Sequence, residues 1–242
     1  MKRPIVRRMT IEGHSPRKIA RRLPWSVLVG VTAIELLAFT GCASTSPTEK
    51  PGFVYKDLPV ATGTVLVGPG TTVVYRGAGA SLSGSSLRLG DVLRDAKVTR
   101  RDLSTIDLAD TKGKVRIISV VPSLDTIVCE QQTHLLSEKN HGLDDRVELI
   151  TVSIDTPFAQ DRFAKQAKIA NITFLSDYRS AEFGKTYGLL LEDPHVLARS
   201  VLVVDENNVI RYMQVTPQIE QLPDMDAAFE AARALVSSGR RS

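Results

Sequence analysis

Cysteine is scarce in this chain: the 242 residues include only two, Cys42 and Cys129. Two cysteines cannot build the disulfide framework of a small secreted domain. The sequence also lacks the Cys-x-x-Cys pairs and Cys/His clusters that bind zinc, so no metal site is expected. Hydrophobic residues (43%) and charged residues (24%) are at ordinary globular levels, which excludes a fully disordered, collagen-like or multi-span membrane protein.

Acidic residues are nearly absent from the N-terminus. Residues 1–24 contain eight Lys or Arg and a single acid, Glu12, although the whole chain has a net charge of only +4. With Glu35 included, the part of the chain after residue 42 has a net charge of −2. The body of the protein therefore gives no electrostatic reason to bind nucleic acid, and no nucleic-acid partner is expected.

An apolar segment, LPWSVLVGVTAIELLAFTG (23–41), follows this basic region and ends directly before Cys42. Such an arrangement is typical of an export signal. The sequence FTGC resembles the lipobox of bacterial lipoproteins, although Phe39 and Glu35 depart from that pattern. This resemblance implies lipidation at Cys42 and anchoring to a membrane of the bacterial cell envelope, facing the periplasm or cell exterior. The alternatives are an uncleaved transmembrane anchor and plain secretion, both of which are also extracytoplasmic.

The sequence predicts three regions. Residues 1–42 are the export signal, residues 43–60 are a flexible tether that begins with a Ser/Thr/Pro-rich stretch, and residues 61–242 are one domain. The domain shows no internal repeat and no sign of a second domain.

Strand and helix patterns alternate along this domain. The predicted elements are a β-hairpin over 64–77 around Gly68-Pro69-Gly70, a loop over 77–86, a short strand at 96–99, buried strands at 115–121 and 147–154, a strand at 172–175, two strands within 198–215, and helices over 126–139, from Pro157, over 180–188 and over 225–238. This order predicts an α/β, thioredoxin-like fold. Its central mixed β-sheet would have helices on both faces and an N-terminal β-hairpin.

The stretch PSLDTIVC joins the first buried strand to the following helix. Pro122, Thr126 and Cys129 match PxxxTxxC, and the segment resembles the active site of peroxiredoxins. The segments at 155–163 (DTPFAQDRF), 174–188 (FLSDYRSAEFGKTYG) and 198–210 (ARSVLVVDENNVI) resemble the thiol peroxidase branch of that family. The resemblance extends over roughly residues 60–240, in order.

This resemblance implies a role for each residue of the motif. Cys129 is the thiolate that attacks a peroxide and becomes a sulfenic acid, helped by its place in the first turn of a helix. Thr126 holds the peroxide, Pro122 shields the thiolate from water, and Arg199 pairs with the thiolate. No cofactor is required. The substrates are hydrogen peroxide or alkyl hydroperoxides.

Other interpretations of these residues remain open. A lone cysteine is commonly a buried structural residue, and Thr126 could simply cap the helix. A membrane-tethered redox sensor or binding module on the same scaffold is the alternative function. A disulfide oxidoreductase would need cysteine at position 132, which is Gln, and a copper-delivery protein would need it at position 133, which is Thr. The histidines are expected on the surface.

The resemblance also identifies one departure. Thiol peroxidases commonly carry a second, resolving cysteine where this chain has Ala164. The sulfenic acid of Cys129 would then be reduced by an external thiol or a redox partner protein, or would pair with a second copy of the chain. With no internal resolution, over-oxidation becomes a risk. The family also implies a homodimer.

Overall fold

The computed structural model describes residues 52–238. The predicted export signal, Cys42 and the first part of the predicted tether lie outside this range. No helix between residues 52 and 238 is both long enough and apolar enough to cross a membrane.

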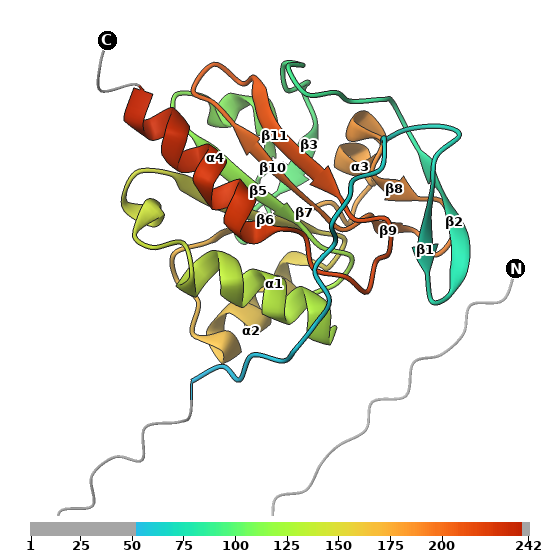
Figure 1. Ribbon diagram of the computed structural model, residues 1–242, viewed down its shortest axis with the longest axis horizontal. Helices are drawn as coiled ribbons and strands as arrows, with labels where there is room; N and C mark the ends of the chain where they lie inside the picture. Colours follow the sequence, from blue (N-terminus) through green and yellow to red (C-terminus); the bar gives the residue numbers. More distant parts are fainter. Residues whose placement is uncertain (1–51, 239–242) are drawn as a thin grey trace, which may run out of the picture. The chain divides into compact units, whose positions relative to one another are not determined.

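A seven-stranded mixed sheet forms the centre of the fold, in the order β11-β10-β5-β6-β7-β3-β4 (Figure 1). Its parallel strands β5, β6 and β7 lie side by side, and the other strands pair in antiparallel fashion. The strands are β3 (Lys97–Thr99), β4 (Thr105–Asp107), β5 (Arg116–Val120), β6 (Glu148–Ser153), β7 (Thr173–Ser176), β10 (Ser200–Val204) and β11 (Ile210–Val215). Strand β5 is buried along its whole length, as its β-branched sequence predicts.

Helices cover both faces of this sheet, as the sequence predicted. Alternate residues of β5 belong to different apolar clusters: Ile117 packs with residues of α1, α2 and α4, whereas Ile118 packs with α3. The helices are α1 (Ile127–Glu138), α2 (Pro157–Ala167), α3 (Glu182–Tyr187) and α4 (Met225–Ser238), with short 3-10 turns η1 (Leu108–Thr111) and η2 (Leu143–Asp145). Pro157 is the first residue of α2 and Gly188 ends α3 in a left-handed conformation, both as expected.

The N-terminal β-hairpin is present, but its predicted position was wrong. Strands β1 (Thr72–Tyr75) and β2 (Ala78–Ser83) pair around Arg76-Gly77, so the predicted loop over 77–86 is largely strand. The turn at Gly68–Gly70 exists, but the chain before it bonds to β11 through Val65 N–H and Val215 O. The hairpin continues into a second, four-stranded sheet with β8 (Leu190–Leu191) and β9 (Val196–Leu197).

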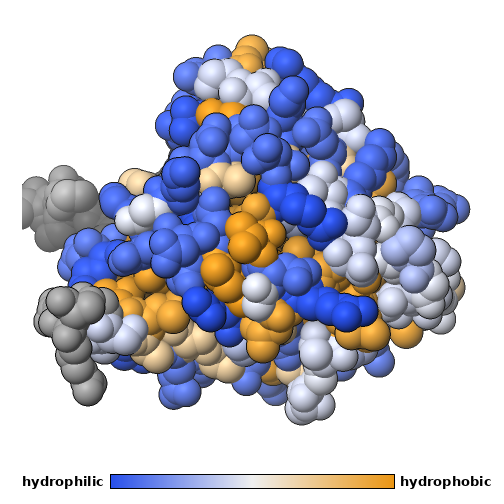
Figure 2. Space-filling model, turned by 90° about the horizontal axis from the view of Figure 1, so that it is seen from above, coloured by the Kyte–Doolittle hydropathy of each residue, from blue (hydrophilic) through white to orange (hydrophobic). Residues whose placement is uncertain are grey.

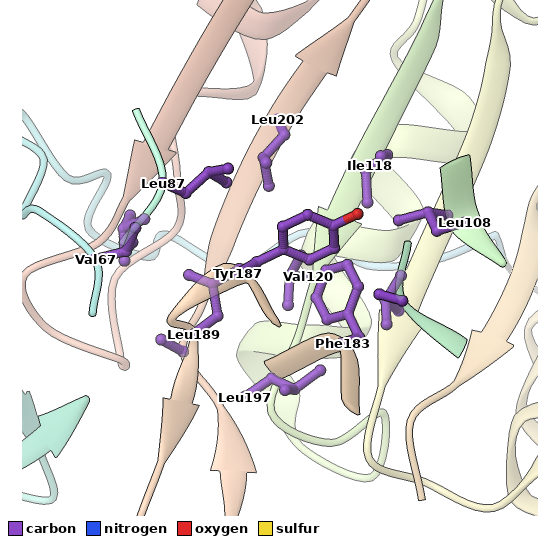
Figure 3. Packing of buried hydrophobic residues seen from close by; sticks show 14 of the residues in the cluster. Val67, Leu87, Leu108, Ile118, Val120, Phe183, Tyr187, Leu189, Leu197 and Leu202 are labelled. Atoms are coloured by element: carbon purple, nitrogen blue, oxygen red, sulfur yellow. The ribbon is translucent and has the colours of Figure 1, made fainter. Parts of the chain in front are cut away.

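The apolar cluster on the α3 face joins the two sheets. Figure 3 shows the ring of Tyr187 between Leu202 of β10 and Ile118 and Val120 of β5, with Phe183 beside it. The Tyr187 hydroxyl donates a hydrogen bond of 2.5 Å to Arg94 O, which satisfies its one polar group in this apolar setting.

The surface seen in Figure 2 is mostly hydrophilic, with apolar side chains gathered near its middle.

Asp177 is a buried acid in the loop between β7 and α3, and it makes the stability of this fold depend on pH. Its carboxylate accepts hydrogen bonds from Phe183 N–H (3.0 Å) and Gly184 N–H (2.9 Å), but burial outweighs them and raises its pKa to about 6. Because the folded protein then holds this proton more tightly than the unfolded chain, ionisation costs stability. We expect the contribution of Asp177 to fall by about 2–3 kcal/mol as pH rises from about 4 to 6.

Chemical denaturation of wild type and Asp177→Asn across this pH range measures that contribution. The variant, which cannot ionise, should lose the downward slope between pH 4 and pH 6. Two parallel stability curves would contradict the expectation.

Candidate active site

The ends of three parallel strands build the candidate site. Because β5, β6 and β7 run in the same direction, their carboxyl ends meet at one edge of the sheet. The loop after β5 leads into α1, and Asp155 follows β6. The Asp155 carboxylate accepts hydrogen bonds from Ser123 Oγ (2.7 Å) and Leu124 N–H (2.8 Å), so a neighbouring strand fixes the loop that precedes Cys129. The sequence had indicated Asp155 only as the first residue of a segment that resembles thiol peroxidases, with no role of its own.

Cys129 lies in the first turn of α1, three residues after the N-cap Thr126, and is fully buried. At this position its backbone N–H has no partner within the helix. Unpaired N–H groups and the helix dipole favour negative charge, which suits a thiolate. Cys129 is free, and it is the only cysteine in the part of the chain that the structure describes.

Arg199 lies directly before β10 and contacts the sulfur, as the sequence predicted. Its Nη2 donates to Cys129 Sγ at 3.2 Å, its Nη1 to Gln132 Oε1 at 2.8 Å and its Nε to Ile219 O at 2.6 Å. The side chain is buried, and among residues 52–238 no carboxylate forms an ion pair with it. A buried cation without a counter-charge is costly, so the thiolate of Cys129 is its natural electrostatic partner.

Gln132 orients this arginine, although it was not predicted from the sequence as a site residue. Its Nε2 donates to Ser119 Oγ (2.8 Å) and Ser200 O (3.2 Å), which directs Oε1 toward Arg199. Gln132 is fully buried. Its spacing of three residues from Cys129, which places both on one side of the helix, was the available signal.

The structure brings the other predicted residues to the same loop without showing their roles. Pro122 is buried just after β5. Thr126 is the N-cap by position, but it is exposed and its hydroxyl donates to Ser123 O at 3.1 Å; it makes no capping bond to α1. No hydrogen bond joins the Thr126 hydroxyl to Cys129 among the described residues, so its contact with the peroxide stays a prediction.

Ala164, at the expected resolving position, lies buried in α2. The prediction that the histidines lie on the surface was wrong for His134, which is buried on α1 against the ring of Phe53. His141 and His195 are exposed as predicted, and His14 lies outside the described residues.

Comparison with known proteins agrees with this geometry. Residues 88–229 match the Redoxin family. A thiol peroxidase of Halalkalibacterium halodurans is 41% identical over 163 residues, which cover 67% of this chain and 98% of that protein. A thiol peroxidase of Streptococcus pneumoniae is 43% identical over 163 residues, covering 67% of this chain and 99% of that protein.

Solved structures give the same result for the fold. A peroxiredoxin-like protein from Aquifex aeolicus superposes with a TM-score of 0.63 at 35% identity, over 68% of this chain and 96% of that chain. These likenesses, together with the mixed sheet covered by helices, confirm the predicted thioredoxin-like fold. Since the family match covers more than half of the chain and the Cys129–Arg199 pair lies within it, the chain belongs to the Redoxin family and is a peroxiredoxin-type thiol peroxidase.

Proposed function

We propose that this protein reduces hydrogen peroxide or alkyl hydroperoxides through Cys129 alone, with an external thiol completing each cycle. The observation that carries the proposal is the 3.2 Å contact between Arg199 Nη2 and Cys129 Sγ in a buried site. A guanidinium has five N–H donors, and three are engaged by the contacts described above. The remaining two are available to an incoming peroxide oxygen.

In the first step, the thiolate sulfur of Cys129 attacks the distal oxygen of the peroxide. An S–O bond forms, the O–O bond breaks, and the departing oxygen takes a proton to leave as water or an alcohol. The sulfur is oxidised to sulfenic acid and the peroxide is reduced. Arg199 stabilises the negative charge that develops on the departing oxygen, as preorganised donors do in other active sites.

In the second step, an external thiol attacks the sulfenic sulfur. A mixed disulfide forms and the sulfenic oxygen leaves as water; a second thiol then releases the Cys129 thiolate and leaves as part of a disulfide. This route is supported by the sequence, because alanine occupies position 164 and the chain's only other cysteine is Cys42. Lipidation of Cys42 would remove that sulfur from redox chemistry and would anchor the protein to a membrane of the cell envelope. A homodimer is the assembly that we expect.

Intact-mass measurement after one equivalent of peroxide tests the one-cysteine cycle. In a full-length chain carrying Cys42→Ser, Cys129 should gain one oxygen, and an added small thiol should convert it to a mixed disulfide and then restore the original mass. Repeated additions should give multiple turnovers per chain. A single stoichiometric oxidation without recovery would contradict the proposal and favour a sensor. A covalent dimer would instead show resolution by a second copy.

A further inference from the structure

The first described residues lie along the helix that carries Cys129. Figure 1 shows this segment running past α1 before the chain reaches β1. The side chains of Phe53 and Tyr55 are half-buried, whereas Val54 between them is 73% exposed. This alternation is that of an extended segment with one side against the body. The predicted tether thus packs on the domain from Phe53 onward, and we refer to residues 53–56 as the clasp.

The clasp binds α1 through its backbone and through both rings. Lys56 N–H donates to Gln131 Oε1 (2.7 Å), and Gln131 Nε2 donates back to Lys56 O (2.9 Å). The Phe53 ring stacks on the imidazole of His134, with ring centroids 3.9 Å apart and planes 11° apart. One turn further on, the Tyr55 hydroxyl donates to Glu138 Oε2 (2.8 Å).

The helix side of this contact is itself linked by hydrogen bonds. His134 Nδ1 and Glu138 Oε1 lie 2.6 Å apart, and Lys139 Nζ lies 5.0 Å from the centre of the Tyr55 ring. Partial burial raises the pKa of Glu138, but the hydrogen bonds from His134 and Tyr55 outweigh it and hold that pKa below its usual range. Burial and the bond to Glu138 raise the pKa of Tyr55. Both groups thus keep the donor and acceptor forms that join clasp to helix at neutral pH.

The residues that the clasp holds alternate with those of the active site. On α1, Gln131 lies between Cys129 and Gln132, and His134 lies two residues after Gln132. The Cys129 sulfur is fully buried in the wound helix. A bulky reagent can reach it only after the residues around it move, and unwinding of α1 as far as Gln131 and His134 would break the clasp contacts.

We propose that the clasp gates the reactivity of Cys129: it holds α1 wound over the sulfur, and so favours small reactants over protein-sized thiols and disulfides. This gate acts on the buried thiol whether or not the protein turns over peroxide. It also deepens the proposed function, because it assigns the reductant to the class of low-molecular-weight thiols. The clasp itself, residues 53–56, precedes the part of the chain that matches the Redoxin family, which begins at residue 88.

Reaction of Cys129 with the aromatic disulfide DTNB measures this gate without using peroxide. The full-length chain with Cys42→Ser has Cys129 as its only thiol. In that background, Phe53→Ala combined with Tyr55→Ala should speed DTNB labelling by about tenfold, because labelling follows the local opening equilibrium of the helix. Amide hydrogen exchange over α1 should accelerate in parallel, while the rate of oxidation by hydrogen peroxide should change less than about twofold.

Val54→Ala is the matched control, since its side chain lies in the same segment but points to solvent. It should leave labelling and exchange unchanged. Equal labelling of wild type and the double variant would overturn the proposal, as would an equal acceleration of labelling and of exchange throughout the domain. If the protein does not turn over peroxide but the DTNB result holds, the gate stands and the proposed function fails.

Discussion

Cys129→Ser is expected to reduce peroxide consumption to the uncatalysed background. Serine keeps the size of the side chain and can accept the hydrogen bond from Arg199, so the fold around α1 should remain. A serine hydroxyl, however, is not ionised in this site and cannot be oxidised to a sulfenic acid. Loss of the nucleophile costs other enzymes as much as about 10⁶-fold, and we expect a loss of at least about 10³-fold here.

A stopped-flow or coupled assay with hydrogen peroxide and an added small thiol measures this loss. Cys42→Ser serves as the matched control and should retain the wild-type rate, because Cys42 lies in the predicted signal and not in the domain that contains the site. Circular dichroism should show the same fold for both variants. Peroxide turnover that persists when both cysteines are replaced would refute the assignment of Cys129 as nucleophile.

Arg199→Lys has the second largest expected effect. Lysine keeps the positive charge but cannot make three directed contacts with Cys129, Gln132 and Ile219 at once. Removal of one preorganised donor typically costs about 10²–10³-fold in rate. We therefore expect the rate constant for Cys129 oxidation to fall by about 10²-fold, and Gln132→Ala, which leaves Arg199 in place but unoriented, to have a smaller effect of about tenfold.

Arg116→Lys provides a control for the replacement of a buried arginine. Arg116 is the first residue of β5 and is fully buried, but it lies at the opposite end of that strand from the site and bonds to Thr111, Asp205 and Asn208. Its replacement should lower the melting temperature and leave the oxidation rate per folded molecule unchanged. If both arginine variants slowed the chemistry equally, the effect would be one of stability and not of the contact with sulfur.

Local signals predicted the part of the site that lies in continuous sequence. The β-branched run of β5 and the following helical pattern placed Cys129 in a first helical turn, and resemblance supplied Arg199. Asp155 and Gln132 needed the structure. Asp155 reaches the loop only because β6 pairs beside β5, and Gln132 acts only because Ser119 and Ser200 turn its amide toward the arginine.

Two predictions from the sequence were wrong for one physical reason, which is contact between segments far apart in the chain. The glycines at 68 and 70 do form a turn, but the residues before this turn bond to β11, some 150 residues away, and so do not form the first strand of the hairpin. His134 is buried because Phe53, about 80 residues earlier, stacks on it. Neither contact leaves a periodic pattern in the local sequence.

If Cys42 carries the proposed lipid, the clasp limits how far the catalytic helix could move from the membrane. Phe53 is bound to α1, and ten residues, and so eleven Cα–Cα steps, separate it from Cys42 along the chain. Even a fully extended chain of that length spans at most about 40 Å. The site would then remain close to the membrane, so that peroxides released at the bilayer surface would be its nearest substrates.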